Sequence, residues 1–391
     1  MDDADIFHEA TADEGGRLDT ATLDPATAKG LNQVAIRARG FLRTAATALP
    51  NMPPIHFDFI DNWKFNAVAF KCKGGYFIGL YRGATATLAM LFDRMLADSL
   101  VLPFIGDVSE ETADLPLIPN VGPDFERSVA SVPTFPRPRN PARRSTAHKL
   151  LELALDFLTA HEFAHIANGH IDYLENSQGI RTIKEVDRAT RSSNLWNSAL
   201  INQTMEMDAD GTAVLICLGS EWGKIVGAFP RPGSEWDYIY DRPGMVSLLW
   251  SWAVSSLFRT FGEARLADED ITQESHPSSR LRSVMIQQAA GRVPRPKELR
   301  THSTLIGDEF YKIPLSIQAA HRDVEKMFSQ VTGKQEVTEG LDDAWGDRGK
   351  SQMHRLQDYW RTTLKGELLR STYQPLSDYG DTGEEVTEEG S

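Results

Sequence analysis

The segment HEFAH, residues 161–165, decides how the rest of the chain is interpreted. It lies inside the most regular apolar pattern of the sequence, in which leucine, phenylalanine, alanine and isoleucine recur at helical spacing over residues 147–168. The pair Ser145-Thr146 precedes this pattern as an N-cap, and Gly169 follows it where a C-cap glycine belongs. We therefore expect a helix over this stretch that carries two histidines about one turn apart.

Two histidines at this spacing can bind one metal ion. On a helix, His161 and His165 are separated by ~40° around the axis and ~6 Å along it, so both imidazoles can reach a common point. Glu162 is turned ~100° from His161 and faces a metal-bound water rather than the ion. The HExxH pattern is typical of zinc peptidases, in which the glutamate accepts a proton from the activated water. The pattern predicts zinc as the cofactor and Glu162 as the general base.

Zinc needs a third protein ligand and an open position for water. His170 is near in sequence, but it falls five residues after His165, whereas the metzincin spacing requires six. The alternative is Glu206, in the segment EMDAD of a second expected helix over residues 194–218. Asp210, one turn after Glu206, can accept the spare ring N–H of a ligating histidine. We expect Glu206 to be the ligand, and His170 can equally satisfy the last carbonyls of the first helix.

HExxH on one helix and ExxAD on a later one resemble the gluzincin superfamily of zinc peptidases, including HtpX-like enzymes. The pair His276-Pro277, with Arg282 six residues after the histidine, resembles a segment that HtpX-like sequences often carry after the ExxAD helix. The run HEFAHIANGH, residues 161–170, is similar to the phage-exclusion Lit-type peptidases, which are cytosolic and cleave a host translation factor. These motifs lie within residues 147–282. HtpX-like enzymes are membrane proteins, and this chain departs from them because it contains no spanning segment.

Two further residues are candidates for the site. His276 would donate a hydrogen bond to the oxyanion that develops on the attacked carbonyl. Alternatively, it would only cap a helix before Pro277. Arg282 would orient His276 or pair with Asp210, and an ordinary surface arginine is the alternative.

The sequence predicts an α+β fold that is mostly helical and gluzincin-like, with a small N-terminal β-hairpin or sheet. Residues 65–81 alternate around Gly74-Gly75, which is typical of a two-residue turn. The hairpin could offer an edge strand to an extended substrate, and a buried hairpin without a ligand is the equal alternative. Apolar periodicity predicts the other helices, over residues 84–100, 245–261, 277–290 and 317–328.

Composition shifts divide the chain into five parts. Residues 1–28 are polar with little periodicity, and residues 376–391 carry six acidic side chains and no basic one, so both ends are expected to be disordered tails. Residues 29–144 form an N-terminal α+β sub-domain that ends in a proline-rich loop. Residues 145–300 form the catalytic domain, and residues 301–375 form a C-terminal helical region.

Composition also excludes several classes of protein. The 41 Lys+Arg against 55 Asp+Glu give a net charge of −14, which disfavours an extensive nucleic-acid groove. The two cysteines, Cys72 and Cys217, exclude a disulfide scaffold and suit a reducing compartment. The acidic N-terminus is unlike a signal peptide, and the apolar run Met245–Phe258 is shorter than the ~20 residues that cross a bilayer. We expect a cytoplasmic protein without nucleic-acid or membrane partners.

The expected function is that of a soluble zinc-dependent endopeptidase that hydrolyses a peptide bond in an intracellular protein, and the Lit-type resemblance implies phage defence. The alternative is a catalytically idle metal-binding regulator or scaffold on a peptidase fold. Glu162 favours the enzyme, because an idle site needs no general base between its ligands. An ungated endopeptidase would damage its own cell, so residues 172–193 and 227–244 are expected to be lids.

Overall fold

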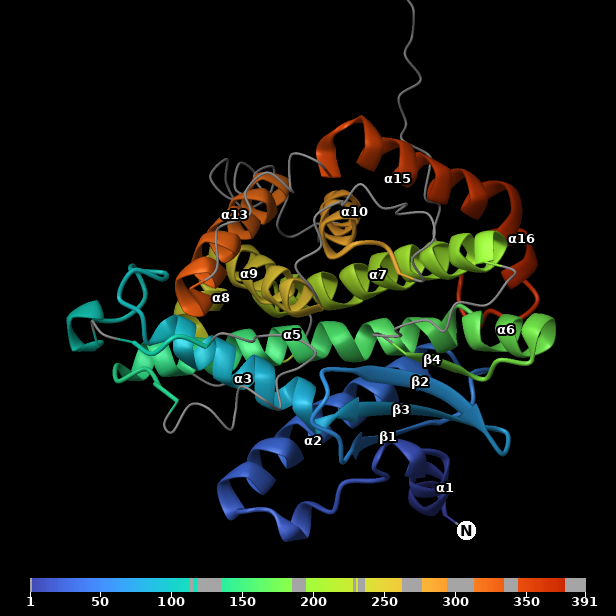
Figure 1. Cartoon of the computed structure of the whole chain (residues 1–391), viewed down its shortest axis with the longest axis horizontal. Helices are drawn as coiled ribbons and strands as arrows, with labels where there is room; N and C mark the ends of the chain where they lie inside the picture. Colours follow the sequence, from blue (N-terminus) through green and yellow to red (C-terminus); the bar gives the residue numbers. More distant parts are fainter. Residues whose placement is uncertain are drawn as a thin grey trace, which may run out of the picture.

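The computed structural model describes residues 2–112, 115–118, 135–184, 195–227, 230, 236–261, 276–293, 313–333 and 344–376. Most of them lie in helices, and a small mixed sheet completes the fold, so the expected α+β class is confirmed. The sheet lies along one side of the long helix α5, and helix α7 lies along the other side (Figure 1). This layering places α5 between the sheet and the remaining long helices.

The sheet has the strand order β1-β3-β2-β4. Its strands are β1 (Ile55–Ile60), β2 (Ala67–Cys72), β3 (Gly75–Tyr81) and β4 (Thr182–Lys184). Strand β3 runs parallel to β1 and antiparallel to β2, and β2 pairs antiparallel with β4. Both strands of the β2-β3 hairpin therefore have neighbours on each side, so the expectation that the hairpin offers a substrate edge is wrong.

The hairpin turn lies one residue earlier than the sequence suggested. Cys72 pairs with Gly75, and the two turn residues are Lys73 and Gly74, with φ of 47° and 82°. A two-residue turn of this kind requires positive φ at both positions. Gly75 is already the first residue of β3, so a single glycine serves the turn.

Residues 2–24 are ordered, and the expectation of a disordered tail over residues 1–28 is wrong. Helix α1 (Asp3–Ala10) places Phe7, which is fully buried, against a cluster on the outer face of the sheet that includes Ile60 and Phe77. Two 3-10 turns follow, η1 (Ala12–Glu14) and η2 (Thr20–Thr22). The polar composition of the segment gave no sign of this contact. One large aromatic side chain is nevertheless enough to dock a short helix on an apolar face of the sheet.

The helices that follow are α2 (Pro25–Ala48), α3 (Arg82–Leu96), η3 (Val108–Glu110), α5 (Pro141–Ala167), α6 (His170–Gln178), α7 (Leu195–Ile225), α8 (Asp237–Tyr240), α9 (Pro243–Phe261), α10 (Ser279–Arg292), α13 (Ile313–Thr332), α15 (Asp347–Tyr359), η5 (Trp360–Leu364) and α16 (Lys365–Leu368). The expected helices are present as α3, α5, α7, α9, α10 and α13, with bounds shifted by several residues, whereas α2, α6 and α8 were not expected. The two expected lid segments contain α6, β4 and α8 in their described parts. Residues 185–193, 228–229 and 231–235 of these segments, and residues 377–391 of the expected acidic tail, lie outside the described residues.

Helix α5 begins at Pro141, so the expected N-cap at Ser145-Thr146 is wrong. The side chain of Asn140 accepts hydrogen bonds from the first backbone N–H groups, and proline suits the first helical position because it has no N–H to satisfy. The expected boundary between residues 144 and 145 falls inside this helix. One hydrophobic core runs from the N-terminal sheet through α5 to α13, so that boundary does not mark a break in packing.

Helices α5 and α7 run antiparallel and are joined by a buried ion pair at the start of α5. Lys149 Nζ lies 3.4 Å from a Glu221 carboxylate oxygen, and the Tyr240 hydroxyl donates to the same carboxylate at 2.7 Å. Burial by itself would raise the pKa of Glu221, but Lys149 and Lys224 outweigh it and lower the pKa to about 2. The carboxylate therefore stabilises the folded chain when it is ionised.

We expect the Glu221→Gln variant to lose stability at neutral pH, on the order of 2 to 3 kcal/mol, because Lys149 keeps its buried charge without the carboxylate. The folded-state pKa lies below the ordinary value of 4.5, so this contribution is complete above pH 4.5 and is lost as the pH falls toward 2. Urea denaturation at pH 7, 5 and 3 measures it. The exposed Glu9, changed to Gln, is the control, and an equal loss in both variants at pH 7 would contradict the assignment.

Candidate metal centre

His161 and His165 on α5 and Glu206 on α7 bring three ligand atoms together in the buried space between the helices. The two Nε2 atoms are 3.0 Å apart, and they lie 3.4 and 3.3 Å from the carboxylate oxygens of Glu206. Ligand atoms bound ~2.0 to 2.1 Å from one zinc ion at tetrahedral angles would be roughly 3.3 to 3.4 Å apart. The group therefore has the spacing of a metal site, as expected from the sequence.

Asp210 and Arg282 hold His161 in one orientation. Asp210 Oδ1 lies 2.9 Å from Nδ1 of His161, which favours a proton on that nitrogen and leaves the lone pair of Nε2 directed at the site. The guanidinium of Arg282 donates to both oxygens of Asp210, at 2.7 and 2.8 Å. Of the roles expected for Arg282, the structure thus contains the pairing with Asp210.

His170 holds His165 in a similar way and is not placed as a ligand. Its Nε2 lies 3.1 Å from Asp208 Oδ2, so the Nε2 proton faces the carboxylate. Its Nδ1 lies 3.0 Å from Nδ1 of His165 and can then accept a hydrogen bond from it. This order of protons leaves Nε2 of His165 with a lone pair that faces Nε2 of His161.

The electrostatics of this group favour a bound cation. Burial lowers the pKa of His165 to about 4, so its ring is neutral at physiological pH. Burial by itself would raise the pKa of Glu206, but the surrounding histidines outweigh it and hold the pKa well below its ordinary value. Two lone pairs and a carboxylate that converge away from water repel one another. A divalent metal ion at their common point removes this repulsion, so the residues fit zinc.

The turn between α5 and α6 determines where His170 lies. Asn168 is the C-cap residue of α5, and Gly169 follows it with a left-handed φ of 79°, the conformation in which a glycine commonly ends a helix, as expected from the sequence. A Cβ atom on Gly169 would lie 2.5 Å from the backbone carbon of Ser371. The glycine therefore lets the chain turn sharply under the C-terminal segment and begin α6 with His170.

The C-terminal segment contacts the end of α5, a feature that the sequence did not predict. The backbone N–H of Tyr373 donates to the carbonyl of Ala167 at 2.8 Å. The side-chain amide of Gln374 donates to Asn168, which in turn donates to Asp208 and, at 3.0 Å, to Thr212. The carboxylate that orients His170 is therefore positioned through Asn168 by Gln374, which lies 206 residues after Asn168 in the chain.

Glu162 follows His161 on α5, and His276 lies near Glu206. Glu162 is 1% exposed, and its charge contributes, after burial and Glu14, to raising the pKa of Tyr81 at the end of β3. His276 Nε2 lies 3.6 Å from Glu206 and 3.1 Å from the backbone carbonyl of Lys184 on β4. The carbonyl can only accept, so the ring donates to β4 in this conformation.

Comparison with known proteins gives no family for the chain: no protein-family model, no curated protein and no solved structure matches it. Among the described residues, no helix combines the length and apolar character needed to cross a lipid bilayer. What can be said of the site therefore rests on its own geometry.

We expect the His170→Phe variant to bind zinc about 10- to 100-fold more weakly than the natural chain, because His165 loses the partner that fixes its tautomer. Zinc affinity is measured by competition with a fluorescent chelator. His354, an exposed histidine on α15, changed to Phe is the matched control and should leave the affinity unchanged. Unaltered zinc affinity in a folded His170→Phe chain would show that the Asp208–His170 pair does not position the ligand.

Proposed function

We propose that this chain is a zinc-dependent endopeptidase of the gluzincin type that cleaves an intracellular protein. One observation carries the proposal, namely the convergence of both histidines of the HExxH segment and of Glu206 on one buried point. Glu162, the residue between the two histidines, gives this group a carboxylate that the three ligands do not use. A binding site without catalysis has no use for that carboxylate.

His161, His165 and Glu206 would hold the zinc ion, which when bound supplies Lewis acidity and lowers the pKa of a water molecule. Glu162 accepts the proton of that water as its oxygen attacks the carbonyl carbon of the scissile bond. The same carboxylate then delivers the proton to the amide nitrogen as the C–N bond breaks. This cycle returns Glu162 to its ionised form.

His276 would stabilise the negative charge that develops on the carbonyl oxygen of the substrate. Its ring N–H donates to the Lys184 carbonyl at 3.1 Å in this conformation. The role therefore requires the ring to exchange that carbonyl for the substrate oxygen. An exchange between two oxygen acceptors conserves the number of hydrogen bonds that the ring makes.

A metal-binding regulator or scaffold is the second candidate, and the burial of the site favours it. His161, His165 and Glu206 are only 1–2% exposed, so a peptide cannot reach the common point in this conformation. An enzyme with this structure must open before it acts. We propose that opening accompanies binding of a folded protein substrate, and the Lit-type resemblance suggests a translation factor during phage infection.

We expect the Glu162→Gln variant to keep near-stoichiometric zinc and its fold but to lose at least ~100-fold in peptidase rate, because the amide cannot take up the proton. Metal content and the rate of substrate cleavage are measured on the same preparation. Glu152→Gln, on the same helix, is the matched control and should change neither quantity. Wild-type cleavage by Glu162→Gln would reject the general-base role and favour the regulator.

We expect the purified chain to leave unstructured casein largely intact and to produce one discrete fragment in lysate of phage-infected bacteria, because the closed site admits only a substrate that opens it. Gel electrophoresis with mass spectrometry identifies the fragment. Uninfected lysate and the Glu162→Gln chain are the controls. Rapid general digestion of casein would contradict gating, and it would leave the peptidase assignment intact.

A further inference from the structure

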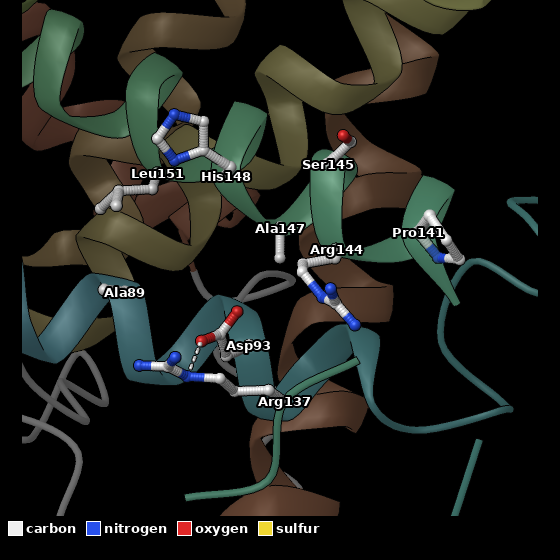
Figure 2. Close-up of a pocket in the computed structure, with 9 residues that line it drawn as sticks. All are labelled: Ala89, Asp93, Arg137, Pro141, Arg144, Ser145, Ala147, His148 and Leu151. Carbon is white, nitrogen blue, oxygen red and sulfur yellow. Dashed lines mark ion pairs between the residues drawn. The ribbon is translucent and has the colours of Figure 1, made fainter. Parts of the chain in front are cut away.

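A hollow in the protein surface lies at the N-terminal end of α5, well separated from the candidate metal centre. It occupies about 510 Å³ between helices α3 and α5 and the segment that leads into α5 (Figure 2). Arg144 and His161 are 17 residues apart on α5, which corresponds to about 26 Å along the helix. A ligand in this hollow would therefore not touch the metal centre.

Two arginines bring positive charge to this hollow. Arg137, Arg144 and His148 line it together with one acidic residue, Asp93. Arg144 points from α5 toward α3, and Arg137 reaches across to Asp93 (Figure 2). In a chain with a net charge of −14, an excess of cations around one cavity is an unusual local arrangement. Cations that share a cavity repel one another unless an anion lies between them.

The neighbouring Arg143 has a structural role, and its contacts differ from those of Arg144. Its guanidinium is fully buried and donates to five backbone carbonyls around the end of α3. Arg144 is exposed, and its Nε and Nη2 donate to the carbonyls of Pro138 and Arg139 at 3.2 and 3.1 Å. These two bonds fix the direction of the guanidinium and leave further N–H groups for a ligand.

Asp93 supplies an acceptor at the hollow. Its carboxylate is 3.4 Å from Nε of Arg137, whose side chain is 79% exposed. Burial raises the pKa of Asp93 to about 6, although Arg137, Arg144 and His148 oppose this change. The carboxylate is thus poorly compensated, and a hydroxyl or amino group of a ligand would donate to it. The side chains of Ala89, Ala147 and Leu151 add an apolar wall.

We propose that this hollow binds a small organic phosphate of about mononucleotide size. Arg137 and Arg144 would hold the phosphate, because planar guanidinium groups match its oxygens in pairs. Asp93 would accept hydrogen bonds from hydroxyl or amino groups of the organic part, and the apolar wall would cover its ring. The volume falls within the range of small-molecule sites, roughly 300 to 1,000 Å³. The first N–H groups of α5 are bonded to Asn140, so side chains define the site.

Isothermal titration calorimetry on the full zinc-loaded chain tests the proposal with AMP, GMP, ribose 5-phosphate, adenosine and inorganic phosphate. We expect a phosphorylated nucleoside to bind at least ~10-fold more tightly than adenosine, since the charged contacts contribute more than about 1.4 kcal/mol. It should also bind more tightly than inorganic phosphate. Equal affinity for inorganic phosphate, or no binding below about 1 mM by any probe, would overturn the proposal.

Substitutions of the two lining arginines test whether AMP binds in this hollow. Arg144→Ala should weaken AMP binding at least ~10-fold. Arg137→Ala should also weaken AMP binding at least ~10-fold. Because this variant leaves the backbone contacts of Arg144 intact, it remains informative if Arg144→Ala is unstable. Arg43 is an exposed arginine on α2, so Arg43→Ala removes the same charge elsewhere and should not affect binding. A loss of binding by Arg43→Ala equal to that of Arg137→Ala would show only non-specific attraction and would reject the site.

Discussion

Helix α7 buries three carboxylates within one and a half turns. The centre of the structure must supply each of them with a partner. Glu206, Asp208 and Asp210 are each 2% exposed or less. Charges in an interior of low polarity destabilise the fold unless each has a partner of its own. Asp210 is paired with Arg282, Asp208 with a histidine and an amide, and Glu206 faces the two Nε2 atoms. The first two carboxylates have close protein partners, whereas Glu206 lies 3.6 Å from both Arg282 and His276, so a cation at the two Nε2 atoms would add to its compensation.

The partners of Asp208 extend this constraint to the C-terminus. A continuous series of contacts runs from Gln374 through Asn168 and Asp208 to His170, and from there to His165. Each contact fixes the orientation of the next group, and hydrogen bonds in series strengthen one another in a buried setting. Residues 371–374 therefore help to fix the orientation of His165 in the candidate metal centre, although they lie outside residues 147–282, which contain the motifs.

The sequence predicted the parts of the fold and the site that depend on local spacing. The i,i+4 pairs His161–His165 and Glu206–Asp210 could be read directly, because helical geometry places such residues on one face. Phe7 and the Asn168–Asp208 contact could not be read in this way, since they join segments between 40 and about 70 residues apart. The start of α5 was misplaced because two competing N-cap signals occur within six residues, and the Asn140-Pro141 pair satisfies more backbone N–H groups.

The contacts beside the candidate site differ in exposure from the pairs that orient the candidate ligands. On its β4 side, His276 donates to the Lys184 carbonyl, and the side chain of Lys184 pairs with Glu14 of the N-terminal segment. Both contacts are partly exposed, whereas the carboxylate pairs that orient the ligands are buried. Exposed ion pairs contribute little to stability and buried ones resist separation. The pairs that orient His161 and His165 are therefore more resistant to separation than the contacts of Lys184.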